Sequence, residues 1–267
     1  MRTTSAAREV LTQVVARVGN FTEESLVEAL ATTLEQTEGG PATAYGIHVG
    51  NLSAAMGDPA YRDALATATY LYADGVSTRV VSQSLGALIR ERLVTTDIIW
   101  PILRVAAVGK HPVFFLGGRE NQAANAADIA ASRVPGLRLV GVASGYFPID
   151  DGDRVADTIA STGAHLVIVA MGVPREQVFC KRFGARTGAR LLMTSGGLYG
   201  YITGQEARAP FWMRRVGLEW AFRLLQSPQR LWARYSWGAI ITARLVLAAR
   251  DLRRRDRLEK ESSRRGR

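Results

Sequence analysis

A short apolar run at residues 166–171, LVIVAM, is the feature that most limits what this chain can fold into. It is rich in β-branched residues and too short to cross a membrane, which is typical of a parallel strand buried on both faces. It stops at a Gly/Pro turn, residues 172–177, that carries polar side chains before a helix start. Ligands bind at that edge in open α/β sheets. We therefore expect a Rossmann-like α/β fold, a mostly parallel sheet flanked by helices, with a binding site beyond this strand.

Other apolar runs and turns give the rest of the expected order. We predict further strands at residues 10–18, 69–72 and 189–194, the end of another strand at residues 47–51, and a strand that runs into a glycine pair within residues 112–118. Thr22 offers an N-cap oxygen to a helix that ends near residue 36, and Glu23 and Glu24 suit its first turn. A chain of 267 residues has room for one large α/β domain, or for such a domain with an appendage.

Several other classes of protein do not fit the composition. The first ten residues lack the apolar core of a signal peptide, and no run is long enough for a transmembrane helix. A single cysteine, Cys180, excludes an internal disulfide, and its helical spacing is typical of a buried small residue. The histidines His48, His111 and His165 show no ligand spacing, so we expect neither a metal nor a cofactor.

The positive charge is concentrated in the C-terminal part of the chain. Residues 208–267 hold 16 basic and 5 acidic residues, a balance of +11, whereas the remainder holds 18 basic and 19 acidic residues, a balance of −1. Tryptophan and leucine alternate with arginine near helical spacing in this part. Such a segment suggests an anionic surface, either a phospholipid bilayer or nucleic acid, although some of its aromatic residues can pack on the protein's own core.

Two turns that follow predicted strands are candidate site elements. Asp74 and Gly75 follow the strand at residues 69–72, where the aspartate can cap a turn or, facing a cleft, accept a hydroxyl proton. Gly117 and Gly118 stand between a strand and a helix, which is how backbone amides are aimed at a phosphate. A plain tight turn explains the glycine pair equally well.

The pair Asp151 and Asp153 has the Asp-x-Asp pattern by which many nucleotide-sugar transferases hold a divalent metal. The pair also precedes a predicted helix at residues 154–162, where acidic residues suit the helix dipole. We favour the helix-start interpretation.

The blocks at residues 172–177, 195–197, 204–210 and 211–235 occur in an order that resembles the WecG/TagA/CpsF glycosyltransferase family. The last block, which contains RAPFWMRRVGLEW and RLWARY, matches the family over nearly thirty residues and is the most specific signal. Asn51, Asp74–Gly75, Arg92 and Asp97 recur in the family's order and spacing. The resemblance covers most of residues 45–235.

The resemblance implies an inverting glycosyltransferase that needs no metal. Its donor would be a UDP-sugar, and its acceptor a sugar or glycan linked to undecaprenyl diphosphate, in bacterial polysaccharide or cell-wall polymer synthesis. Asp74 would be the catalytic base. The implied substrate-binding residues are Asn51, Gly75, Arg92, Gly117, Gly118, Gly172, Pro174, Glu176, Gln177, Arg208, Arg223 and Arg230.

This chain departs from the family pattern at several positions. Val49 replaces a threonine, the usual Gln-Glu is inverted to Glu176-Gln177, and Gly200 stands where an aspartate is usual. Ala233 replaces an arginine near the end of the last block. These departures bear on the choice of donor sugar more than on the type of reaction.

We expect three segments with different tasks. Residues 1–204 would form the α/β catalytic core, residues 205–250 a helical appendage that binds the membrane and completes the active site, and residues 251–267 a basic, disordered tail. The expected partners are the donor, the polyprenyl-linked acceptor and an anionic membrane, with a homo-oligomer possible. The protein would be peripheral on the cytoplasmic face. The alternative is a nucleotide-binding protein without catalytic activity, whose basic tail binds nucleic acid.

Overall fold

The structure is a computed structural model that describes the chain except residues 1, 120, 208, 211–212, 214–218, 227 and 266–267. For residues 2–4, 219–220, 223, 230–231, 233–235, 260 and 262–265 it gives the helical backbone alone.

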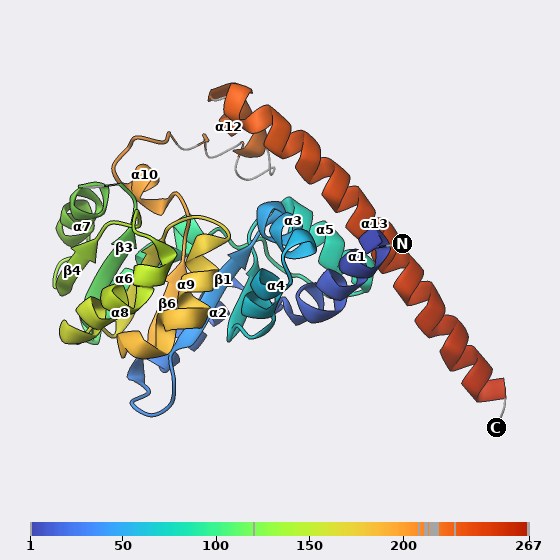
Figure 1. Cartoon of the computed structure of the whole chain (residues 1–267), viewed down its shortest axis with the longest axis horizontal. Helices are drawn as coiled ribbons and strands as arrows, with labels where there is room; N and C mark the ends of the chain where they lie inside the picture. The colour runs from blue at the N-terminus through green and yellow to red at the C-terminus, as the bar shows by residue number, and fades with distance from the viewer. Residues whose placement is uncertain are drawn as a thin grey trace.

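The centre of the molecule is a six-stranded sheet in which every neighbouring pair is parallel (Figure 1). The strand order is β2-β1-β6-β5-β3-β4. The expected α/β fold is therefore confirmed. The prediction of a strand end at residues 47–51 is wrong, because the strand ends at Ile47 and His48 caps a helix that begins at Val49. The bounds of the strands are β1 (Ala42–Ile47), β2 (Tyr70–Ala73), β3 (Val113–Gly117), β4 (Leu139–Ala143), β5 (Leu166–Ala170) and β6 (Leu191–Thr194).

Helices cover both faces of the sheet and create two buried clusters. Strand β5 contributes Val167 and Val169 to the first cluster and Leu166 and Ile168 to the second, as the alternation of side chains along a strand requires. The first cluster draws on α1 (Arg2–Gln13), α3 (Val49–Gly57), α4 (Pro59–Ala66), α5 (Val76–Leu85), α8 (Gly152–Ser161), α9 (Arg175–Phe183) and α13 (Pro228–Arg265). The second draws on α2 (Glu23–Glu35), α6 (Thr95–Val108), α7 (Gln122–Arg133) and α10 (Leu198–Ile202).

Local signals place several helix ends. The Thr22 side chain accepts a hydrogen bond from the Ser25 amide, which confirms the predicted cap of α2. Asp58 caps α4, with Pro59 in its first turn. The remaining elements are α12 (Glu219–Gln226) and the short 3₁₀ helices η1 (Val15–Arg17), η2 (Ile149–Asp151) and η3 (Gly184–Thr187).

The prediction of a strand at residues 10–18 is wrong. The chain there forms α1 and η1, and the apolar residues Ala7, Val10, Leu11 and Val14 are buried in the first cluster. Their spacing of three and four residues follows the period of a helix. The strand was predicted instead because the segment is rich in β-branched valine, which favours strands.

The prediction of a disordered tail is also wrong for residues 251–265, because α13 continues to Arg265. An ion pair one turn apart joins Arg255 to Asp251 at 2.9 Å. Earlier in the same helix, Ile241, Leu245 and Ala249 are buried in the first cluster, where α13 packs against α1, α3 and α5 (Figure 1). The middle of α13 therefore belongs to the core of the domain.

Candidate active site

The ends of the strands form a crevice at one edge of the sheet. After β5 the chain enters α9, whose Phe179 and Phe183 join the first cluster, whereas after β3 and β6 it enters α7 and α10 on the opposite face. Where the connections after neighbouring strands run to opposite faces of the sheet, a crevice opens between them, and open α/β sheets bind ligands in that crevice. The crevice holds a cavity of about 670 Å³.

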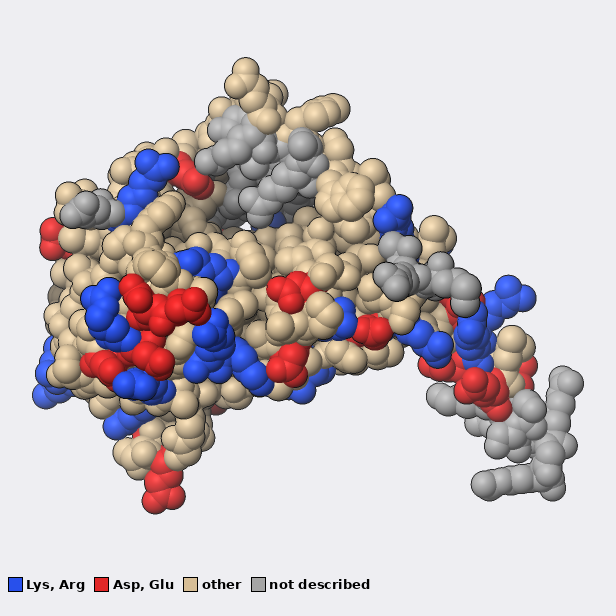
Figure 2. Space-filling model, viewed as in Figure 1, with Lys and Arg blue, Asp and Glu red and all other residues tan. Residues whose placement is uncertain are grey.

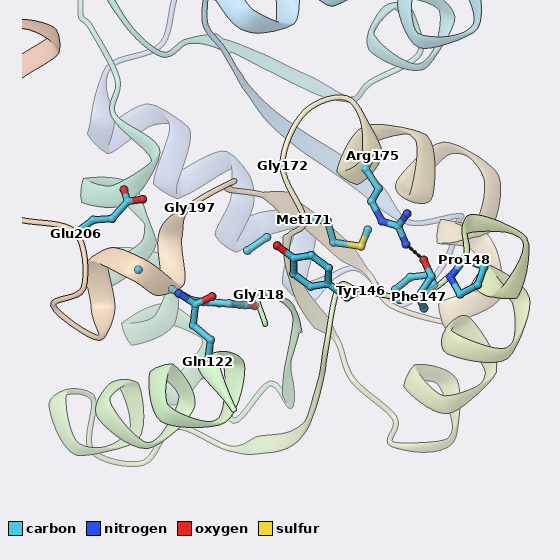
Figure 3. Close-up of a pocket in the computed structure, with 14 residues that line it drawn as sticks. Gly118, Gln122, Tyr146, Phe147, Pro148, Met171, Gly172, Arg175, Gly197 and Glu206 are labelled. Carbon is cyan, nitrogen blue, oxygen red and sulfur yellow. Dashed lines mark hydrogen bonds between the residues drawn. The ribbon is translucent and has the colours of Figure 1, made fainter. Parts of the chain in front are cut away.

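Glycine turns form much of the cavity wall (Figure 3). Gly118, Gly172 and Gly197 have φ values of +65°, +79° and +79°, a backbone conformation that residues with a side chain rarely adopt. The turns are tied together by backbone hydrogen bonds, with Gly118 N donating to Ala170 O at 3.0 Å and Gly145 N to Gly118 O at 3.1 Å. The ligand would therefore meet main-chain atoms over a wide area.

Gly117 has a different role from its neighbour. A Cβ on Gly117 would lie 2.2 Å from the Ala170 carbonyl oxygen, so this glycine permits the close approach of β3 to β5. Of the predicted pair, Gly118 lines the cavity and Gly117 supports it.

Side chains that the sequence did not single out complete the wall. Tyr146 lines the cavity with 74% of its surface exposed. Arg175 lies over the Phe147 ring, 4.7 Å from its centroid, and donates to the Phe147 carbonyl oxygen (Figure 3). Its Nε is buried and has no hydrogen-bond partner among the described residues. An exposed aromatic ring and a guanidinium thus face the same cavity.

Asp74 lies farther along the same edge and is held by a short polar chain. The Thr95 hydroxyl donates to Asp74 Oδ2 at 2.8 Å and contacts the Tyr72 hydroxyl at 2.9 Å. Because the single hydroxyl hydrogen of Thr95 is donated to Asp74, the Tyr72 phenol, whose pKa burial raises, donates to Thr95 Oγ1. Gly46 makes room for this chain, since a Cβ there would lie 2.5 Å from Thr95 Oγ1. Gly75, with φ +109°, starts α5.

Asp74 does not line the cavity, and the strand order explains its position. Strands β1 and β6 lie between β2 and β5. With about 4.8 Å between neighbouring strands, the ends of β2 and β5 are roughly 14 Å apart. One edge of the sheet thus carries both the cavity and a carboxylate.

Three predicted binding residues are buried beneath this edge. Asn51, Glu176 and Gln177 are 0%, 3% and 1% exposed. Asn51 Nδ2 donates to the Tyr61 hydroxyl at 2.8 Å, and that hydroxyl faces Gln177 Oε1 at 3.4 Å. Gln177 Nε2 then donates to Glu176 Oε1 at 3.0 Å. In this structure the three residues are buried, and their hydrogen bonds join the strand ends to one another.

The remaining predicted residues have varied positions. Gly172 lines the cavity, while the exposed Pro174 stands at the N-cap of α9. Arg92 lies in the segment between α5 and α6, outside the cavity wall. Arg208 and the side chains of Arg223 and Arg230 lie outside the described residues.

The acidic pair near residue 150 serves the start of α8. Asp151 occupies the N-cap position without a side-chain cap, and Asp153 lies in the first turn. Arg186 pairs with Asp153 at 3.3 Å and also with Asp157, whose pKa it lowers through a side-chain hydrogen bond. Among the described residues, no group of three or more His, Cys, Asp or Glu is placed to hold a metal. The described acidic residues here are engaged with arginines.

Comparison with known proteins decides the family. The model of the glycosyl transferase WecG/TagA/CpsF family matches residues 12–257. The chain belongs to this family of glycosyltransferases. The match extends beyond the resemblance seen in the sequence and includes α2 and most of α13.

Two curated relatives share the name N-acetylglucosaminyldiphosphoundecaprenol N-acetyl-beta-D-mannosaminyltransferase. The protein from Bacillus spizizenii is 30% identical over 211 residues, which cover 79% of this chain and 80% of the relative. The protein from Bacillus subtilis is 28% identical over 181 residues, which cover 68% of this chain and 70% of the relative. The WecG/TagA/CpsF assignment thus extends over the strand ends that carry Asp74 and the cavity.

Proposed function

We propose that the protein transfers a sugar from a UDP-sugar to an N-acetylglucosamine linked to undecaprenyl diphosphate, with inversion and without a metal ion. The observation that carries the proposal is the shared sheet edge, on which a glycine-walled cavity lies at the ends of β6, β5 and β3 and Asp74 lies at the end of β2. The names of the two relatives support the acceptor and make N-acetylmannosamine the first donor sugar to test.

The cavity suits a nucleoside diphosphate. Positive-φ glycines at Gly118, Gly172 and Gly197 let a diphosphate approach the backbone, and α7 and α9 both begin beside it. Amides at helix starts favour anions. Arg175 supplies a guanidinium to the same cavity, and the exposed ring of Tyr146 offers a face on which a uracil can stack.

Asp74 suits the acceptor end. The acceptor hydroxyl attacks C1 of the donor sugar, the bond from C1 to the UDP oxygen breaks, and the hydroxyl proton passes to the Asp74 carboxylate. Attack from the face opposite the leaving group inverts the anomeric centre. The backbone amides and Arg175 stabilise the departing diphosphate. Arg208, Arg223 and Arg230 are proposed to add to this charge.

Thr95 is expected to orient the base. Thr95→Val removes the donor to Asp74 Oδ2, and loss of a hydrogen bond to a charged group should lower kcat about tenfold. The donor KM should change little, because Thr95 is remote from the cavity wall. Steady-state kinetics check this result. Thr95→Ser keeps the hydroxyl and should retain most of the activity; equal losses in both variants would contradict the orienting role.

The outer surface of α13 is proposed to bind an anionic membrane. Trp237, Ile240 and Leu247 are 52%, 45% and 65% exposed, and Arg244 lies over the Trp237 ring, 5.9 Å from its centroid. Aromatic and aliphatic side chains beside arginine suit the headgroup region of a bilayer. Toward the end of the helix, basic and acidic side chains alternate (Figure 2). No helix within the described ranges is long and apolar enough to span a membrane.

Replacement of this stripe should separate membrane binding from catalysis. In the Trp237→Ser, Ile240→Ser, Leu247→Ser variant, partition onto phosphatidylglycerol vesicles should fall at least about tenfold, since each lost apolar contact weakens insertion. Turnover on a short-chain, soluble acceptor should persist. Val108→Ser, at a site 85% exposed on α6, is the control. Tighter binding of the unaltered protein to duplex DNA than to vesicles would favour the nucleic-acid alternative.

A donor screen tests the proposed activity. Purified protein is incubated with individual UDP-sugars, with and without a short-chain polyprenyl-diphosphate N-acetylglucosamine, in the presence of a metal chelator. We expect UDP release that depends on the acceptor for at least one donor, first of all UDP-N-acetylmannosamine. The absence of acceptor-dependent release with every donor would contradict the proposal.

A further inference from the structure

Glu206 lines the cavity, and neither the proposed diphosphate contacts nor the catalytic base account for it. Figure 3 shows Glu206 and Arg175 on opposite sides of the cavity. The cavity therefore has an acidic end beside α10 and a basic, aromatic end beside the turns after β4 and β5. A ligand with an anionic part and a neutral part should take one orientation in it, because the anionic part is drawn to the basic end.

Hydrogen bonds hold the segment that carries Glu206 in place. The Glu206 amide donates to the carbonyl oxygen of Gly200, in α10, at 3.0 Å. The preceding residue, Gln205, accepts from Gln122 Nε2 at 2.9 Å, and Gln122 is the first residue of α7. The segment is thus tied to two helices beside the cavity, so Glu206 is positioned before a ligand arrives.

The lack of a side chain at Gly200 makes room for the side chain of Glu206. Gly200 is buried in α10, and a Cβ there would lie 3.2 Å from Glu206 Cγ and 3.5 Å from Glu206 Cδ. A Cβ on Gly197 would lie 4.0 Å from Glu206 Oε2. The carboxylate is therefore beside the turn that follows β6.

This end of the cavity is where the proposed function would place the transferred sugar. Tyr146 and Arg175 would take the uracil and the diphosphate at the other end. Only β1 separates β6 from β2, whose end carries Asp74. A sugar that lies between the diphosphate and the acceptor hydroxyl is therefore expected beside Glu206.

The chemistry of a carboxylate restricts which sugar fits there. A carboxylate accepts hydrogen bonds, and with two acceptor sites on each oxygen it can bind a ligand as well as groups of the protein. The hydroxyl groups of a neutral sugar supply the matching donors. A uronic acid, which carries a carboxylate of its own, would bring two like charges together, and such a contact is strongly unfavourable within a binding site.

We propose that Glu206 is a specificity-determining residue that binds hydroxyl groups of the donor sugar and excludes uronic acid donors. The assignment rests on the proposed function, because it takes the cavity to be the donor site. It goes beyond that function by naming the class of sugar that the site accepts, a neutral one.

Binding of a matched pair of donors tests the assignment. Kd values are measured by calorimetry on the full chain for UDP, UDP-N-acetylmannosamine and the uronic acid formed from that donor by oxidation at C6. The unaltered protein should bind the neutral donor at least about tenfold more tightly than the acid. In Glu206→Gln this ratio should fall to about threefold or less, because the amide keeps the shape of the side chain and removes its charge. Glu38→Gln, in an exposed turn outside the cavity wall, removes the same charge and should keep the original ratio.

A second pair of variants tests the place of the carboxylate. Glu206→Ala removes the atoms that a Cβ on Gly200 would meet, so Gly200→Asp fits in that background and returns a carboxylate to the space. Gly200 lies within a helix and outside the left-handed region, so its backbone accepts the change. Discrimination against the acid donor should be lost in Glu206→Ala and should recover at least about threefold in the double variant.

The outcomes separate this assignment from the proposed function. Equal Kd values for the two donors in the unaltered protein, a result that needs no variant, would overturn the role of Glu206. An unchanged ratio in Glu206→Gln would also overturn it, as would a double variant that binds UDP but discriminates no better than Glu206→Ala. Failure of the unaltered protein to bind UDP or either donor would instead contradict the proposed function, and the assignment with it.

Discussion

Asp74→Asn should lower turnover at least about a hundredfold, the usual scale for loss of a general base. Asparagine has nearly the same shape and keeps an oxygen that accepts from Thr95, so the variant should fold normally. It cannot take the proton of the acceptor hydroxyl. Acceptor-dependent UDP release measures turnover, and circular dichroism with thermal unfolding confirms the fold.

Asp63→Asn is the matched control for this variant. Asp63 lies on α4 with its side chain 62% exposed, and its partner Lys181 is 3.3 Å away. An exposed ion pair of this kind contributes little to stability, so activity should be unchanged. Near-normal turnover by folded Asp74→Asn would remove Asp74 from the mechanism, whatever the control shows.

Leu245→Ala should lower the free energy of unfolding by about 2–5 kcal/mol, the usual cost of a large cavity in a core. Leu245 is fully buried between α13 and the helices it packs on, so truncation leaves a void inside the first cluster. Urea unfolding followed by circular dichroism gives the value. Leu247→Ala, two residues away and 65% exposed, should change it by no more than about 0.5 kcal/mol.

The pair tests whether α13 is part of the domain or a separable anchor. Similar, small effects of the two substitutions would mean that the helix leaves the core at little cost. The structure predicts a large difference, and with it that removal of residues 205–267 would damage the fold itself. Loss of activity in such a truncated chain would not by itself show that the appendage completes the active site.

The strands could be predicted because their physical signal is local. A continuous β-branched run such as residues 166–171 has few ways to hide its surface other than in a parallel sheet. Residues 10–18 carry the same residue types at helical spacing, and there the tertiary packing of α1 decided the outcome. The order of the strands follows from long-range packing, which no local pattern encodes.

The site could be predicted in part for a related reason. Strand ends mark the binding edge, so Asp74, Gly118 and Gly172 were accessible from sequence. The sequence did not show which polar side chains are buried. Glu176 and Gln177 are buried, although they follow a strand just as a ligand-binding pair would. Tyr146 follows β4, an edge strand of the sheet, and it lines the cavity only because the fold brings that edge beside the turns after β3 and β5.

Product analysis tests the central claim most directly. The purified protein is given UDP-N-acetylmannosamine of α configuration and a short-chain polyprenyl-diphosphate N-acetylglucosamine, and the lipid product is examined by mass spectrometry and proton NMR. The account predicts that the lipid gains one sugar residue, joined through a β linkage. Free sugar without a lengthened lipid, or an added sugar that keeps the α configuration, would contradict it.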